Sequence, residues 1–196
     1  AVEDDEFRIR HHFQYLALSG GVLNDQAIHV IDVCRAVLET NPLYAFGQSS
    51  AAGRKFEYGD THTNYQVIYK YPNDVNVAVQ QMSVGSTSGG VCARFFGELG
   101  TAEANYSGGV FITGPNKWDS GNNNALSDAD ALKGKSFIDS IVSGKYINQI
   151  EAGCNSTLAA IMGREACYSG KKVTWKDMVS GKQRYGDQPD LKQFLK

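Results

Sequence analysis

The chain has 196 residues, of which 42% are hydrophobic and 20% charged, a composition that excludes disorder over the whole length. Nineteen Lys and Arg residues against 21 Asp and Glu residues give a net charge of −2 without a basic cluster, which argues against a nucleic-acid surface. No apolar run approaches the roughly 20 residues that span a bilayer. We therefore expect a folded domain with no nucleic acid and no membrane among its partners.

A helix over 22–38 is the first element that the sequence defines. Residues 1–18 mix two apolar periodicities, and Ser19-Gly20-Gly21 then interrupts the chain. From Val22 to Leu38, apolar residues recur three and four positions apart, which predicts an amphipathic helix that Asn41-Pro42 ends.

Alternating strands follow this helix, joined by short turns. Pro72-Asn73-Asp74 separates two alternating runs and predicts a β-hairpin, and Gly97-Glu98-Leu99-Gly100 separates two further runs and predicts a second one. The predicted strands are, in chain order, 43–50, 64–71, 75–79, 91–96, 101–106 and 110–113.

The last third of the chain is predicted to be helical. After a loop over 114–127, helical spacing covers 129–143 and 148–169, and Thr174 caps a short helix with Asp177 at its third position. The order helix, strands, helices predicts an α+β fold, an open, largely antiparallel β-sheet with helices packed on one face. We expect a single domain over 1–196, with its core at about 7–179 and a polar tail at 180–196.

The four cysteines form no CxxC pair, so they are interpreted as small buried hydrophobic residues and not as metal ligands; they are Cys34, Cys92, Cys154 and Cys167. Unpaired cysteines favour the cytoplasm, although any export signal would precede Ala1. The chain has no GxGxxG after a strand and no GxxxxGK[ST], so we expect this chain alone to bind no cofactor.

Asp25 and His29 are the strongest catalytic candidates. They stand four residues apart on the predicted helix, so their side chains can meet on one face, where a carboxylate fixes the tautomer of an imidazole. Asp32 is a possible second acceptor. Ile28, Val30 and Ile31 surround His29 and predict a partly buried ring, whereas the plainer alternative is a solvated surface pair.

Other polar and aromatic side chains are interpreted as substrate contacts, with an exposed or strand-end position as the alternative for each histidine. His11 and His12 follow two arginines, His62 opens a strand, and Trp118 lies in a predicted loop. The full set of expected substrate contacts is His11, His12, Tyr15, His62 and Trp118.

Several consecutive segments together resemble the C-terminal domain of Gfo/Idh/MocA oxidoreductases. Residues 19–33 (SGGVLNDQAIHVIDV) resemble the helix that opens that domain, including its Asp-xxx-His pair. The other similar segments are 69–75, 95–103, 136–141 and 152–163, and the resemblance covers about Phe7 to Val179.

The resemblance implies the substrate-binding and oligomerisation half of an NAD(P)-dependent sugar or cyclitol oxidoreductase. In such an enzyme His29 is the acid/base, Asp25 orients it, and hydride goes to a nicotinamide. The family's N-terminal Rossmann domain and its catalytic lysine are missing from this sequence, so that domain is an expected partner, in cis or in trans, and NAD(P) is implied only for a full-length or paired enzyme. A sugar-like molecule and a second copy bound through the open sheet are the other expected partners.

Two other function classes are compatible with these residues. A free-standing lyase, isomerase or hydrolase would use Asp25 and His29 for proton transfer without a redox cofactor. A non-enzymatic binding domain would oligomerise through its uncovered sheet face.

Overall fold

The computed structural model describes residues 4–55, 57–84, 90–121, 125–181 and 190–194. They form two compact units, one of residues 1–86 with 154–196 and the other of residues 87–153. Helices and exclusively antiparallel strands in the described residues confirm the α+β class. The strands are divided between two four-stranded sheets, one in each unit, where the sequence indicated a single sheet. Alternation identifies strands and hairpins, but it does not identify which strand edges pair outside a hairpin. The single-domain span stays a prediction.

Short helices and a glycine turn lead into the first unit. They are α1 (Asp5–Arg10), η1 (His12–Gln14) and α2 (Leu16–Ser19). Gly20 and Gly21 then adopt φ values of 74° and 83°, a left-handed backbone that favours glycine. The predicted helix over 22–38 follows, but it begins with a π-helical turn, η2 (Leu23–Ala27), before α3 (Ile28–Leu38).

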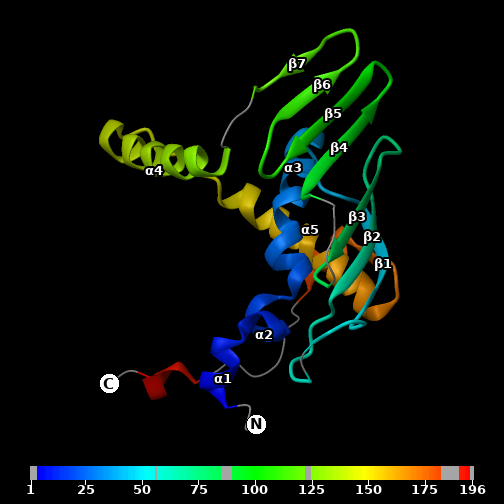
Figure 1. The fold of residues 1–196 in the computed structure, drawn as a ribbon, viewed down its shortest axis with the longest axis vertical. Helices are drawn as coiled ribbons and strands as arrows, with labels where there is room; N and C mark the ends of the chain where they lie inside the picture. Colours follow the sequence, from blue (N-terminus) through cyan, green and yellow to red (C-terminus); the bar gives the residue numbers. More distant parts are fainter. Residues whose placement is uncertain (1–3, 56, 85–89, 122–124, 182–189, 195–196) are drawn as a thin grey trace. The chain divides into compact units, whose positions relative to one another are not determined.

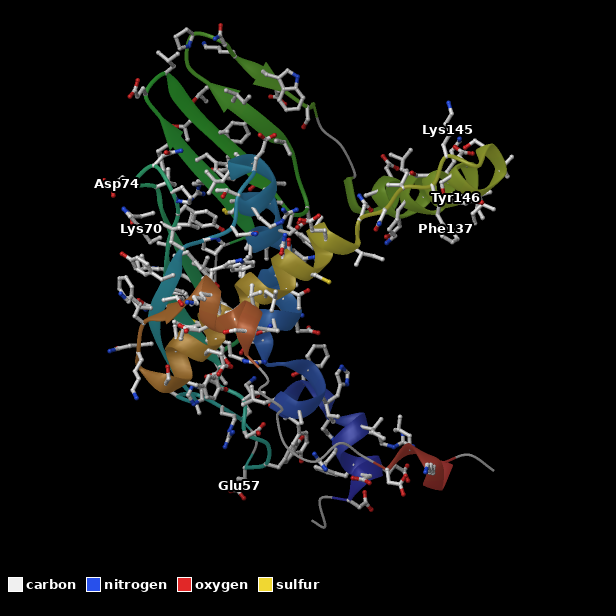
Figure 2. All side chains as sticks on the ribbon, turned by 180° about the vertical axis from the view of Figure 1, so that it is seen from behind. Glu57, Lys70, Asp74, Phe137, Lys145 and Tyr146 are labelled. Carbon is white, nitrogen blue, oxygen red and sulfur yellow. The ribbon has the colours of Figure 1, made fainter. Side chains whose placement is uncertain are left out.

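The sheet of the first unit has the strand order β3-β2-β1-β8. Its strands are β1 (Tyr44–Ser50), β2 (Asn64–Lys70), β3 (Asn76–Met82) and β8 (Val173–Thr174). The predicted hairpin is confirmed, because β2 pairs with β3 throughout, and Asn73 and Asp74 turn with φ values of 57° and 62°. Lys70 forms an ion pair with Asp74 at this turn, where Figure 2 labels both side chains.

One face of this sheet carries the core. Tyr65, Val67 and Tyr69 alternate along β2 and are each 1% exposed. They pack with residues of η2, α3 and α5 (Ile150–Ser169), so both long helices cover the same face (Figure 1). The core residues contributed by these helical segments are Leu23, Ala27, Ile31, Ala159, Ala160, Met162, Ala166 and Cys167.

Two glycines allow α5 to approach the sheet closely. A Cβ at Gly163 would lie 2.0 Å from Tyr69 Oη, and a Cβ at Gly47 would lie 2.8 Å from Cys167 Sγ. Neither position has room for a side chain. The sequence pattern did not indicate this constraint, because Gly163 lies inside a helix and Gly47 inside a strand, where propensity alone disfavours glycine.

The second unit contains the other sheet and one long helix. Its strands pair in the order β4-β5-β6-β7, and the predicted second hairpin is confirmed by the pairing of β4 with β5. The register places Phe95, Ala102, Ile112 and Trp118 on one face. The elements are β4 (Cys92–Gly97), β5 (Gly100–Asn105), β6 (Val110–Thr113), β7 (Trp118–Asp119) and α4 (Ala125–Ser143).

The C-terminal elements follow local rules that the sequence carries. Thr174 and Asp177 form the predicted capping box at the start of α6 (Trp175–Ser180). Of the predicted polar tail, residues 182–189 and 195–196 lie outside the described residues, and η3 covers Leu191–Phe194. None of the described helices has the length and apolar character needed to cross a membrane.

All four cysteines carry free thiols. Cys34 and Cys167 are buried, which agrees with their interpretation as small hydrophobic residues, and burial raises the pKa of each thiol to about 11. Cys92 is half-buried and Cys154 is exposed, so the interpretation is wrong for Cys154.

We predict that Gly163→Ala lowers the free energy of unfolding by about 2 kcal/mol, because the added methyl group displaces the Tyr69 ring or α5 itself. Gly153→Ala is the matched control. It lies in the same helix with no atom within 4 Å of the new Cβ, and its helix propensity raises stability by up to about 1 kcal/mol. Urea denaturation of both variants measures the difference, and equal effects would contradict the proposed close approach.

Candidate functional site

A cavity of about 560 Å³ lies in the first unit, beside the start of the long helical segment. Its wall is made by the end of η1, by η2, by the loop before β2, and by the end of β3. Its polar lining includes Gln26, Arg54, Lys55, His62 and Gln81. This volume is within the range of about 300–1,000 Å³ that small-molecule sites occupy.

His62 is the one predicted site residue that lines this cavity. Its Nδ1 forms a 2.7 Å hydrogen bond with Ser49 Oγ, and its ring stacks on Tyr168 with 4.2 Å between centroids. The backbone N–H of His62 donates to Tyr168 Oη at 2.9 Å. The ring is therefore fixed in orientation from two sides, and among the described residues Nε2 has no hydrogen-bond partner.

The environment of His62 favours the neutral imidazole. Partial burial lowers the pKa of His62 below its ordinary value of 6.5, and the positive charge of Arg54 lowers it further. A neutral, oriented imidazole can accept a hydrogen bond from a ligand hydroxyl or donate one to a ligand oxygen, depending on its tautomer.

Asp25 and His29 lie beside the cavity wall without lining it. Asp25 belongs to the π-helical turn η2, and His29 is the second residue of α3. The expectation that the His29 ring is partly buried is wrong, because the residue is exposed. The neighbouring apolar residues turn toward the core while His29 faces outward. Asp25 stands in the π turn and His29 in the α-helix that follows it, and the pairing of their side chains stays a prediction.

Asp32 takes part in contacts between α3 and α5. Its carboxylate accepts a hydrogen bond from Ser156 Oγ, and Arg35 Nε lies 3.8 Å from the same oxygen. Arg35 also donates to Ser156 Oγ at 2.8 Å. These contacts tie α3 to α5, so Asp32 has a structural role in the fold.

The N-terminal candidates form an aromatic cluster outside the cavity. His11 stacks on Phe7 with 4.2 Å between centroids, and its Nδ1 lies 2.8 Å from the Phe7 carbonyl oxygen. Tyr15 is 7% exposed beneath the guanidinium of Arg8. His12 is exposed and packs against Phe13, which does line the cavity. Substrate contact by His11, His12 and Tyr15 stays a prediction.

Trp118 belongs to the second unit. The prediction of a loop is wrong at this position, because Trp118 begins β7 and pairs with Ile112 of the neighbouring strand β6. The tryptophan is 52% exposed at the edge of that sheet. Its proposed contact with substrate stays a prediction.

The sequence did not indicate most residues of the site, among them Gln26, Arg54 and Tyr168. Arg54 follows Gly53 in a predicted polar loop, where a lone cation gives no signal. Tyr168 lies at the end of α5, more than 100 residues from His62, and only the packing of α5 on the sheet brings the two together. Gln26 was adjacent to the Asp25 candidate, and the π turn determines that it lines the cavity.

The described residues contain neither a cluster of metal-ligating side chains nor a parallel pair of strands. No group of three or more His, Cys, Asp or Glu side chains among them could hold a metal ion. Every strand pair described is antiparallel, so the parallel strand–loop–helix unit that holds a dinucleotide pyrophosphate is not formed here.

These features define a class: an α+β domain with two helices on one sheet face and a polar cavity beside the first of them. The family model described as "GFO/IDH/MocA C-terminal domain" matches residues 3–103. The chain belongs to the Gfo/Idh/MocA family, and the match identifies it with the family's C-terminal domain. A comparison with curated protein sequences finds no match.

Solved structures of oxidoreductases share the fold at low sequence identity. Myo-inositol 2-dehydrogenase from Lactobacillus plantarum is 15% identical with a TM-score of 0.60, over 87% of this chain and 53% of that one. Levoglucosan dehydrogenase, solved with NADH and levoglucosan, is 14% identical with a TM-score of 0.67, over 82% and 52%. An oxidoreductase from Agrobacterium radiobacter, solved with NAD+, L-tartaric acid and magnesium, is 13% identical with a TM-score of 0.65, over 81% and 50%. The chain spans about half the length of each.

Two tyrosines on β2 differ in how their hydroxyl groups are satisfied. Tyr69 Oη is buried with no hydrogen-bond partner in the described structure, whereas Tyr65 Oη lies 3.2 Å from Tyr168 Oη. Tyr69→Phe should raise the free energy of unfolding by about 1 kcal/mol because it removes an unsatisfied buried hydroxyl. Tyr65→Phe, four residues away on the same face, should lower it by about 1 kcal/mol. Chemical denaturation measures the free energy of unfolding of both variants. A loss of stability in Tyr69→Phe would show that its hydroxyl has a partner.

The lowered pKa of His62 predicts a stability loss in mild acid. The unfolded state binds a proton at this histidine near pH 6.5, whereas the folded state resists protonation to lower pH. The contribution is therefore complete above the unfolded-state pKa of 6.5 and is lost as the pH falls below it and through the lower folded-state pKa. We expect His62→Gln to flatten this part of the stability profile, measured by urea denaturation between pH 7.5 and 5. Equal slopes for the wild type and the variant would exclude His62 as the cause.

Proposed function

We propose that this chain is the substrate-binding half of an NAD(P)-dependent oxidoreductase that acts on sugars or cyclitols, with His29 as the acid/base and Asp25 as the residue that orients it. One observation carries the proposal. The exposed His29 is the second residue after the π-helical turn that holds Asp25, and Gln26 of the same turn lines the 560 Å³ cavity. Single π turns inside helices occur frequently at functional sites.

His29 would move a proton at the substrate oxygen. An exposed imidazole on the first turn of a rigid helix can accept the proton of a substrate hydroxyl, and it returns the proton in the reverse direction. His62, oriented by Ser49 and Tyr168, would hold a second hydroxyl of the same polyol. The match to the family's C-terminal domain supports an NAD(P)-binding domain as the partner, in cis or in trans.

The uncovered face of the first sheet supports oligomerisation as part of the proposal. Phe46 is 49% exposed and Met82 is 58% exposed on this face. With Ile68 and Ala78 they form an apolar surface that a second copy would cover. His11, His12, Tyr15 and Trp118 belong to the proposal as further substrate contacts.

The test uses the polypeptide that carries this chain together with its dinucleotide-binding domain. We predict that His29→Gln lowers kcat/KM for NAD(P)+-dependent polyol oxidation by about 10²- to 10⁴-fold, the usual contribution of a general base. Asp25→Asn should retain part of that activity, because it affects the orientation of His29 and not the proton transfer itself. Glu39→Gln at the other end of α3 is the control and should leave the rate unchanged.

Two results would contradict the proposal. Full activity in His29→Gln would exclude the histidine as the acid/base. Activity that persists after removal of the nucleotide, but is lost in His29→Gln, would instead favour a cofactor-free lyase, isomerase or hydrolase with the same proton-transfer residues.

A further inference from the structure

We propose that the cavity beside η2 binds a sugar-sized polyol that carries one anionic group, a carboxylate or a phosphate. This inference names the substrate class of the proposed function, and it rests on that function only for the polyol nature of the ligand. The anionic group follows from the cavity's own charges.

The described wall of the cavity contains two cations and no carboxylate. Arg54 and Lys55 both line it, and neither forms an ion pair with a described residue. The Nη1 group of Arg54 donates to the Gly59 carbonyl oxygen at 2.9 Å, which fixes the guanidinium. A guanidinium has five N–H donors, so most of them remain for a ligand.

The two acidic side chains of the loop between β1 and β2 do not line the cavity. Glu57 is exposed and projects from the tip of its loop, as Figure 2 shows, and it does not line the cavity. Asp60 accepts a hydrogen bond from the backbone N–H of Leu16 at 2.7 Å, at the start of α2, and it is also absent from the wall.

The positive charge of Arg54 also acts on His62 in the cavity wall. Arg54 is one of the two causes that lower the pKa of this histidine, so the guanidinium charge reaches the imidazole in the cavity wall. Burial and the Arg54 charge both favour the neutral ring, which offers a hydrogen bond without adding a charge. Arg54 and Lys55 are left as the binding groups for an anion.

The rest of the wall suits the hydroxyl groups of a polyol. Gln26 and Gln81 present amide groups, and Phe13, Val22 and Val84 present apolar surface. A neutral ligand bound over the half-buried guanidinium of Arg54 would displace water from this charge and offer no opposite charge in its place. An anionic group replaces that water with a charge-assisted hydrogen bond, which is bidentate where the geometry allows.

Isothermal titration of this chain with three probes of similar size tests the inference: D-gluconate, D-glucose 6-phosphate and neutral myo-inositol. We expect at least one of the two anions to bind about tenfold or more tightly than myo-inositol at low ionic strength. Preference for gluconate assigns a carboxylate and preference for glucose 6-phosphate assigns a phosphate. Arg54→Gln should abolish the preference, whereas Arg10→Gln, in an exposed ion pair with Glu6, should leave it unchanged.

A second measurement shows that the Arg54 variant is folded. The NMR titration of His62 should shift to higher pH in Arg54→Gln, because one of the causes of its lowered pKa is removed. Equal affinity for all three probes, or an unchanged preference in Arg54→Gln, would overturn the anionic class and leave the proposed function intact. Binding of none of the probes would overturn both the anionic class and the cavity's role as the substrate site.

Discussion

Two consecutive residues of α5, Gly163 and Arg164, determine where the site is built. Gly163 lets the helix approach β2 until no side chain fits between them. Arg164 is 3% exposed, and its Nη1 donates to the Gly20 carbonyl oxygen at 2.9 Å while Glu165 pairs with the guanidinium at 3.1 Å. A buried charge of this kind costs about 3–5 kcal/mol to leave unpaired, so the Gly20–Gly21 turn is held firmly to α5. The segment that begins at this turn carries Asp25, Gln26 and His29.

The site depends on this anchor for its geometry. Gly21 lies against Tyr65, where a Cβ would come within 3.1 Å of the hydroxyl, and Tyr65 in turn meets Tyr168. Tyr168 stacks on His62 and accepts its backbone N–H. The turn, the core of β2 and the end of α5 are therefore one connected structure, which orients His62 at the cavity and sets the start of α3 beside it. A rigid frame of this kind keeps binding groups in place before a ligand arrives.

Much of the fold could be predicted because its signals are local. The hairpin at Asn73-Asp74, the helix over 22–38 and the capping box at Thr174 each follow from neighbouring residues. The pairing of strand edges, the π turn and the exposure of His29 could not, since they depend on packing between distant segments. The same limit applies to the site. His62 could be predicted because it stands at the start of a predicted strand. Arg54 and Tyr168 could not, because only the folded chain brings the loop that holds Arg54 and the end of α5 that holds Tyr168 close to His62.

The most direct test of the account is to map polyol binding on this chain by ¹H–¹⁵N NMR, with D-gluconate and myo-inositol as the probes. The account predicts that the ligand shifts the amide signals of Gln26, Arg54, Thr61 and His62, the residues that line the cavity. Shifts confined to the outer sheet face around Phe46 and Ile68, or to the second unit, would contradict it, because the polyol site would then lie away from the start of α3.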